Sequence, residues 1–205
     1  MVQNILISFA ITSLTIILGY SVYFFSKLTS FKSKAVSFNK PISIVICAKN
    51  EANNLIKFLP KVLEQDYPEF EVVVVNDQSK DGTAAILKNL EKIYSNLVIV
   101  NIDEHINHWP GKKFALTLGI KTAKNEYLLL TDADCLPNSS NWAKQMSSKF
   151  NDSEIVLGFG GYQKRKGLLN KIIRFDTFNV AKQYLSYALA GFTYMGVGRN
   201  MAYKK

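Results

Sequence analysis

Charged side chains are absent from the start of this sequence. Between Met1 and Ser26 there are none, and the run from Ile5 to Phe25 is almost continuously apolar. As a helix, a run of this length can cross roughly 30 Å of hydrocarbon. A secretory signal peptide would need a basic start, a shorter apolar core and a small-residue cleavage site, and a buried soluble helix would need a polar face. Segment 1–26 is therefore predicted to be a transmembrane helix, with those two interpretations as the alternatives.

Basic residues are also missing before the apolar run, although several follow it. Because lysine and arginine are retained on the cytoplasmic side of a membrane span, the body of the protein is predicted to be cytoplasmic. This makes it a single-pass membrane protein, with the bacterial inner membrane as the expected location. Segment 27–40 is interpreted as a basic linker and segment 41–205 as the folded domain. The basic residues after the run are Lys27, Lys32, Lys34 and Lys40.

Cysteine is scarce, and the basic charge comes without any nucleic-acid-binding motif. A reducing compartment is consistent with leaving Cys47 and Cys135 as thiols, although the sequence leaves a bridge between them open. The net charge of +9, from 25 basic and 16 acidic residues, favours phosphate-bearing ligands or an anionic membrane surface. We therefore predict a membrane and a phosphate-bearing ligand as partners, and no nucleic acid.

Short apolar runs alternate with amphipathic segments after Lys40. The runs have the composition of buried strands, and the segments between them carry apolar residues at helical spacing. This alternation predicts an α/β fold, with a mainly parallel sheet flanked by helices on both faces. The strands are predicted at 42–47, 71–75, 97–101 and 127–131, and the helices at 53–65, 83–94 and 112–123.

Polar residues cluster where these predicted strands end. Ala48–Glu51 follows the first strand, Asn76–Ser79 the second, and Asp132–Asp134 the fourth. In such sheets, ligands bind beyond the carboxyl ends of the strands. Asp132 and Asp134 are two apart in an extended segment, so both carboxylates can face one side and share Mg²⁺ or Mn²⁺. An isolated pair of this kind is more often a simple turn, so its neighbours decide its meaning.

Beyond Pro137 the alternation stops. A short helix near 142–150 and a strand near 154–159 are predicted, followed by a basic cluster and a long amphipathic stretch at 168–190. That stretch could pack on the domain or lie in the membrane interface, and packing is the simpler interpretation. The basic cluster consists of Lys164, Arg165, Lys166, Lys171 and Arg174.

Five segments, in this order, resemble the motifs of the family 2 glycosyltransferases, which have the Rossmann-like GT-A fold. The resemblance covers residues 41–205. The second motif departs from the family pattern because Asn76 replaces its first aspartate. The segments are the opening strand with its N-E pair at 44–51, the D-D-x-S-x-D-G-T element at 76–83, G-K-x-x-A-L at 111–116, D-x-D at 132–134 and G-x-G-x-N-x-A-Y at 196–203.

This resemblance implies an enzyme that transfers a sugar from a nucleotide donor, usually UDP-linked, with inversion at the anomeric carbon. A divalent metal, Mg²⁺ or Mn²⁺, would assist. With the predicted anchor, it also favours a lipid-linked or polysaccharide acceptor at the cytoplasmic membrane face. By the resemblance, the nucleotide-sugar site comprises Ala48, Asn50, Glu51, Asp77, Lys112 and Asp132, the metal ligands are Asp132 and Asp134, and the acceptor-side loop contains Gly196, Gly198, Arg199 and Asn200.

The family's catalytic base is an Asp or Glu downstream of the glycine loop. The base is therefore expected beyond Lys205, in a C-terminal part of the catalytic domain that this sequence lacks. Asp152, Glu154 and Asp176 match no such position and are interpreted as surface residues. One alternative is a membrane-tethered nucleotide-binding or scaffold module without turnover, which retention of the D-x-D pair disfavours. A nucleotidyltransferase would need a glycine-rich loop after the first strand, and residues 48–54 contain no glycine.

Overall fold

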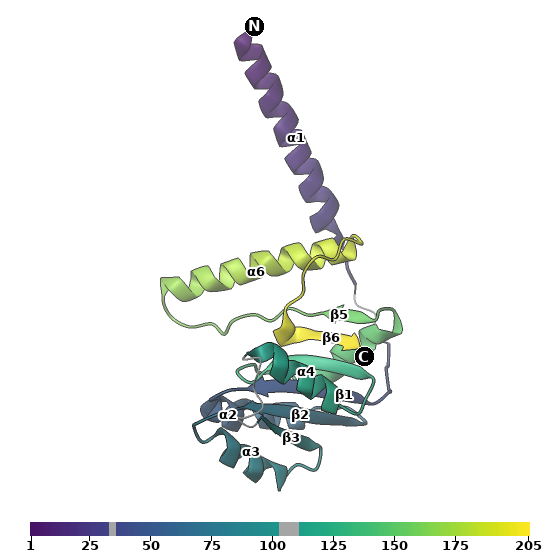
Figure 1. The fold of residues 1–205 in the computed structure, drawn as a ribbon. Helices are drawn as coiled ribbons and strands as arrows, with labels where there is room; N and C mark the ends of the chain where they lie inside the picture. The colour runs from purple at the N-terminus through teal and green to yellow at the C-terminus, as the bar shows by residue number, and fades with distance from the viewer. Residues whose placement is uncertain (33–35, 103–110) are drawn as a thin grey trace. The chain divides into compact units, whose positions relative to one another are not determined.

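The computed structural model of the chain describes residues 1–32, 36–102 and 111–205 (Figure 1). It divides into two compact units. Residues 1–34 and 159–196 form one, called the helical unit below, and residues 35–158 and 197–205 form the other, called the sheet unit. Lys34 of the predicted linker lies outside the described residues.

The described residues of the sheet unit form a sheet of six strands. They are β1 (Ile42–Ala48), β2 (Phe70–Asp77), β3 (Leu97–Ile102), β4 (Tyr127–Asp132), β5 (Ile155–Leu157) and β6 (Met201–Lys204). Their order in the sheet is β3-β2-β1-β4-β6-β5. The first four are mutually parallel, whereas β6 runs antiparallel to both β4 and β5. The predicted mainly parallel sheet is confirmed, and β6 is a strand that the sequence analysis missed.

Helices cover both faces of this sheet, as predicted. They are α2 (Ala52–Leu63), α3 (Thr83–Glu91), α4 (Lys112–Thr122) and α5 (Trp142–Ser147). Side chains of α2, α3 and α5 pack with Ile44 and Val74 on one face, and those of α4 pack with Val45 and Val73 on the other. Adjacent strand residues point to opposite faces, so a continuous apolar run such as 72–75 supplies both cores.

Helix α4 approaches the sheet closely at Gly119. A Cβ at this position would lie 2.7 Å from Val45 Cγ1 and 2.9 Å from Val75 Cγ2. Glycine thus allows the helix backbone to lie directly on β1 and β2, which fixes the start of α4 at the sheet edge.

Gly119→Ala is therefore expected to lower the free energy of unfolding of the sheet unit. Overpacking a core costs about 1–3 kcal/mol, which outweighs the roughly 1 kcal/mol that alanine gains over glycine in a free helix. Denaturant unfolding of the detergent-solubilised chain, followed by circular dichroism, measures the difference. Lys121→Ala on the same helix is the control and should be nearly neutral. A more stable Gly119→Ala variant would contradict the close packing.

The helical unit contains the two longest helices of the chain. Helix α1 (Val2–Thr29) is apolar and long enough to cross a membrane, and none of its residues is buried. Helix α6 (Leu168–Leu189) corresponds to the predicted amphipathic stretch and contacts α1. The first helix is thus present as predicted, although it continues three residues beyond the proposed end at Ser26. The boundaries of the predicted linker and domain remain predictions.

Candidate active site

The carboxyl ends of β1, β2 and β4 lie side by side at one edge of the sheet. In the parallel register Ala48 is opposite Asn76, and Cys47 is opposite Asp132. Asp77, the last residue of β2, is opposite Ile102 of β3. The strand-end residues that the sequence analysis selected are therefore brought to the same edge, where parallel α/β sheets bind their ligands.

The loops after β1 and β2 are tied together by hydrogen bonds. The backbone N–H of Asn50 donates to Ser79 Oγ at 2.9 Å, and the N–H of Lys80 donates to Asn50 Oδ1 at 2.8 Å. Asn50 has a φ of 57°, in the left-handed region that asparagine tolerates better than most residues. Asn50 thus acts in the structure as a link between two loops, whatever it contributes to a ligand.

Asp81 extends this link to the starts of two helices. Its Oδ2 accepts a hydrogen bond from the N–H of Ala52 at 3.1 Å, and its Oδ1 accepts one from the N–H of Thr83 at 2.9 Å. Thr83 Oγ1 in turn accepts the N–H of Glu51 at 3.0 Å. The hydrogen bonds from Thr83 hold the pKa of Asp81 below its usual value, so the carboxylate persists at neutral pH and is lost only in acid. These hydrogen bonds join the loops after β1 and β2 to the starts of α2 and α3.

Buried polar groups lie behind these loops at the end of β2. The side chain of Asp77 is only 9% exposed, and its Oδ2 lies 3.4 Å from Lys49 Nζ. Asn76 Nδ2 donates to Asn101 Oδ1 at 3.0 Å, while Asn76 Oδ1 is buried and has no partner among the described residues. A buried acceptor without a partner costs about 1–3 kcal/mol, so this edge suits a ligand that carries N–H groups. The sequence analysis included Lys49 in the polar segment after β1 without giving it a role, and it gave no role to Asn101, which is next to the last residue of β3.

The acidic pair after β4 lies beside a lysine. Ligand atoms of Asp132, Asp134 and Cys135 all fall within 4.8 Å of one another. Lys112, the first residue of α4, donates a hydrogen bond from Nζ to Asp132 Oδ1. Gly111 precedes it with a φ of 130°, a conformation that favours glycine. An ammonium group therefore already occupies one position at which a cation would bind.

These donors fit a hard divalent cation. Carboxylate oxygens are the ligands that Mg²⁺ and Mn²⁺ prefer. The third group of the cluster does not compete, because burial and the nearby Asp134 carboxylate raise the pKa of Cys135 to about 11, and a thiol binds metals as the thiolate. Cys135 Sγ instead lies 3.5 Å from Asp134 Oδ1, to which it donates. Asp132 and Asp134, the metal ligands that the family resemblance implies, thus lie together, and their role as ligands stays a prediction.

Both cysteines are free thiols, and we expect both to react slowly with alkylating reagents. Burial raises the pKa of Cys47 to about 11 as well, so at pH 8 roughly one thiol in a thousand is ionised. Iodoacetamide modification, followed by mass spectrometry between pH 7 and 10, should accelerate about tenfold per pH unit. A cysteine introduced by Lys57→Cys on the exposed side of α2 should level off near pH 8.5, the ordinary thiol value. A similar plateau for Cys47 would contradict its burial.

The predicted acceptor-side loop is held by its asparagine. Asn200 lies in a 3₁₀ turn (Gly198–Asn200) before β6, and its Oδ1 accepts a hydrogen bond from Trp142 Nε1 at 2.9 Å. Its backbone oxygen accepts the N–H of Gly158 at 2.9 Å. Gly198, Arg199 and Asn200 thus belong to the sheet unit, whereas Gly196 ends the helical unit. Their role toward an acceptor stays a prediction.

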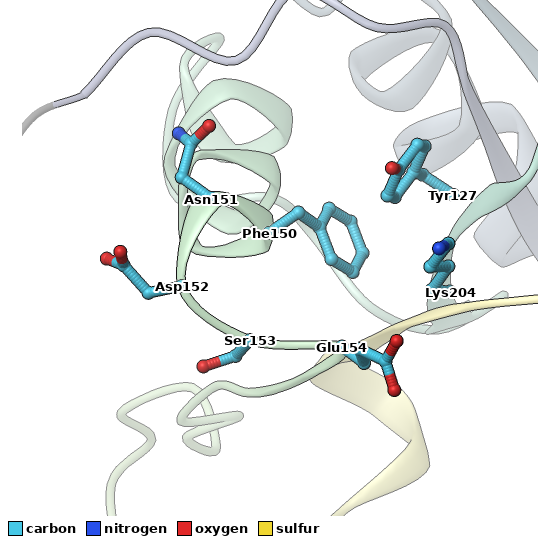
Figure 2. Close-up of a pocket in the computed structure, with 7 residues that line it drawn as sticks. All are labelled: Tyr127, Phe150, Asn151, Asp152, Ser153, Glu154 and Lys204. Carbon is cyan, nitrogen blue, oxygen red and sulfur yellow. The ribbon is translucent and has the colours of Figure 1, made fainter.

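A hollow of about 310 Å³ lies at the end of β4 opposite to Asp132 (Figure 2). Tyr127, the first residue of β4, faces Phe150 across it, with 4.9 Å between their ring centroids. Since five strand residues span roughly 16 Å, this hollow is far from Asp132. Glu154 lies in this hollow with Asp152, and its backbone oxygen accepts the N–H of Lys204 at 2.9 Å. Both carboxylates are therefore badly placed to act as a base, which fits their interpretation as surface residues.

The chain belongs to the family described as glycosyl transferase family 2, whose sequence model matches residues 43–205. Among curated relatives, it is 35% identical over 134 residues to the 4,4′-diaponeurosporenoate glycosyltransferase of Staphylococcus haemolyticus, covering 64% of this chain and 34% of that protein. It is 34% identical over 123 residues to the poly-β-1,6-N-acetyl-D-glucosamine synthase of Staphylococcus epidermidis, covering 58% and 29%. The chain thus spans about a third of the length of these relatives.

Solved structures show the same GT-A architecture. The mannosyltransferase PcManGT from Pyrobaculum calidifontis, in complex with GDP-Man and Mn²⁺, matches with a TM-score of 0.68 at 21% identity, over 100% of this chain and 56% of that one. The S. aureus protein TarS 1-349, in complex with UDP-GlcNAc, matches with a TM-score of 0.52 at 26% identity, over 62% and 37%. The fold predicted from the sequence is therefore confirmed.

Proposed function

We propose that this chain is the donor-binding part of an enzyme that transfers a sugar, with inversion, from a nucleotide-sugar to a lipid-linked or polysaccharide acceptor at the cytoplasmic membrane face. One observation carries the proposal: Asp77, Lys112 and the pair Asp132 and Asp134 come from three separate segments and meet at one sheet edge. Residues 41–205 would be the catalytic domain, tethered by residues 1–26 through the linker 27–40.

The chain's own residues offer a complementary surface to a nucleoside diphosphate. Asp77 is nearly buried and can accept hydrogen bonds from N–H groups of a nucleobase, beside the unpartnered Asn76 Oδ1. Ala48, Asn50 and Glu51 form the adjoining loop. Lys112 stands at the start of α4, where free backbone N–H groups and the ammonium group favour phosphate oxygens.

The metal belongs to the same proposal. Asp132 and Asp134 would hold Mg²⁺ or Mn²⁺, which, when bound, offsets the negative charge that develops on a departing nucleoside diphosphate. Lys112 would leave Asp132 and turn toward the phosphates. The Asp132 carboxylate would then be free to bind the metal, and the lysine would add a second positive charge beside the phosphates. The base that accepts the proton of the acceptor hydroxyl is expected beyond Lys205.

The relatives support the nature of the partners. Two structural neighbours hold GDP-Man and UDP-GlcNAc, both nucleotide-sugars. The two curated relatives are named for 4,4′-diaponeurosporenoate and for a polymer of N-acetylglucosamine. Lysines follow the apolar run of α1 and none precedes it, which supports a cytoplasmic orientation, with the bacterial inner membrane as the proposed location. UDP-sugars are the expected donors, and a lipid or growing glycan is the expected acceptor.

Calorimetric titration of the full chain in detergent tests the donor site. UDP, GDP and dTDP are each titrated with and without Mn²⁺. The proposal expects one nucleotide to bind, and to bind much more tightly with the metal. If none of the three binds to protein that circular dichroism shows to be folded, the chain is instead a membrane-tethered scaffold.

A further inference from the structure

Helix α6 is joined to the carboxyl-terminal end of α1 by aromatic side chains. The rings of Phe24 and Tyr187 are stacked, with centroids 4.2 Å apart. The ring centroid of Phe192, three residues beyond the end of α6, lies 6.1 Å from that of Phe24. Lys182 Nζ lies 4.3 Å from the ring centroid of Phe25, a cation–π contact worth about 0.5–1 kcal/mol where exposed. These contacts fix the carboxyl-terminal end of α6 against the last turns of α1.

Those last turns are where a membrane span would meet the lipid headgroups. Tyr20, Tyr23, Phe24 and Phe25 follow the aliphatic part of α1, and Lys27 comes directly after them. Aromatic residues followed by lysine mark the boundary between hydrocarbon and water. From this level α6 runs across the axis of α1 rather than along it (Figure 1). If α1 spans the membrane, α6 therefore lies along the membrane plane at headgroup depth.

The first half of α6 presents apolar side chains to its surroundings. Leu168, Ile172 and Phe175 follow one another at helical spacing on one face, and their exposed fractions are 73%, 54% and 67%. Leu169, beside them, is 71% exposed. A contiguous group of this kind is unfavourable in water and marks a surface that another apolar phase covers.

The same region is strongly basic. Residues 159–196 contain six basic side chains and one acidic one, Asp176. Three of the basic residues stand directly before α6, where the N–H of Arg165 is held by Asn170 Oδ1 at 2.8 Å, so the basic run is folded onto the start of the helix. The basic residues are Lys164, Arg165, Lys166, Lys171, Arg174 and Lys182.

We propose that α6 is an interfacial helix. It inserts Leu168, Ile172 and Phe175 among the upper acyl chains, while the basic run 164–166 binds anionic phospholipid headgroups. The partner is the anionic surface of the bilayer that α1 crosses. Helix α6 packs against α1 within one unit, and its basic residues carry the charge that complements anionic lipids. This inference rests on the proposed membrane anchoring, and it gives the basic cluster a role in holding the enzyme at the membrane where its acceptor resides.

Tryptophan quenching in vesicles tests the insertion. The full chain is reconstituted into phosphatidylcholine–phosphatidylglycerol vesicles whose lipids are brominated near the top of their acyl chains. Phe175→Trp should add fluorescence that these lipids quench, whereas Ile93→Trp, at an equally exposed apolar position of the sheet unit, should add fluorescence that they do not. Phe9→Trp in α1 reports the anchor itself. Quenching at position 9 but not at 175 overturns the interfacial helix and leaves the anchor intact, while no quenching at position 9 overturns both.

Removing the basic run tests the headgroup contact. With Phe175→Trp as reporter, the combined variant Lys164→Gln, Arg165→Gln and Lys166→Gln should lower the ratio of docked to undocked α6 by about a hundredfold, because each basic residue near an anionic surface contributes roughly fivefold. The matched control replaces three exposed lysines of the sheet unit, Lys57, Lys88 and Lys92, by glutamine and should leave quenching unchanged. Equal quenching in vesicles of phosphatidylcholine alone would overturn the anionic-lipid contact. If the tryptophan at position 175 instead becomes buried without quenching, and more so at higher protein concentration, the apolar face of α6 binds a second copy of the chain, which overturns the interfacial helix.

Discussion

Asp134→Ala is expected to remove the metal-dependent part of nucleotide binding. With Mn²⁺ present, the dissociation constant of the nucleotide should rise on the order of 100-fold. The variant loses one carboxylate ligand of the metal, and this interaction should contribute about as much free energy as a strong charge-assisted hydrogen bond. Without metal, the affinity should change little, since Asp134 is exposed and lies outside the Asp77 and Lys112 contacts. Titration of the nucleotide identified for the wild-type chain, with and without Mn²⁺, separates the two effects.

The matched control is Asp152→Ala. It removes one exposed carboxylate of the same unit at the opposite end of β4, so it changes the net charge equally without touching the cluster. Its titrations should coincide with those of the wild-type chain. If Asp134→Ala keeps the full metal effect, the divalent ion binds elsewhere, and the assignment of Asp132 and Asp134 as ligands is wrong.

The parallel core could be predicted from the sequence because its signals are local. Residues 72–75 form a continuous apolar run that a two-faced buried strand requires, and polar residues follow directly at Asn76 and Asp77. Once four such strands are parallel, their ends must meet at one edge. The placement of Asp132 at the same sheet edge as Asn76 and Asp77 thus follows from pattern and topology, without knowledge of any side-chain contact.

Contacts between distant segments could not be predicted in this way. Strand β6 has only four residues, and its partners Leu128 and Leu129 are more than 70 positions away, so no local periodicity marks it. The pairs Lys49–Asp77 and Asn76–Asn101 likewise depend on the register between strands. The association of α6 with α1 joins segments from opposite ends of the chain, and aromatic residues alone do not reveal which partner they contact.

Lys112→Met is expected to change the affinities for metal and nucleotide in opposite directions. In the structure, Lys112 Nζ is bound to Asp132 Oδ1, so the ammonium group competes with a cation for that carboxylate. Removing it should strengthen binding of Mn²⁺ alone, by up to about fivefold for a pair this exposed. Nucleotide affinity should fall about 10- to 100-fold, because the phosphates lose a charge-assisted partner at the start of α4.

Lys113→Met provides the control, because this exposed lysine is the next residue of the same helix and its removal changes the net charge equally. Titrations of Mn²⁺ alone, and of nucleotide with saturating Mn²⁺, should both match the wild-type chain for this variant. Opposite shifts in Lys112→Met alone would mean that one side chain exchanges the metal ligand for the phosphates when the donor arrives. A parallel loss of both affinities would instead assign Lys112 a structural role in holding Asp132, since a competitor for the metal site cannot also be needed to form it.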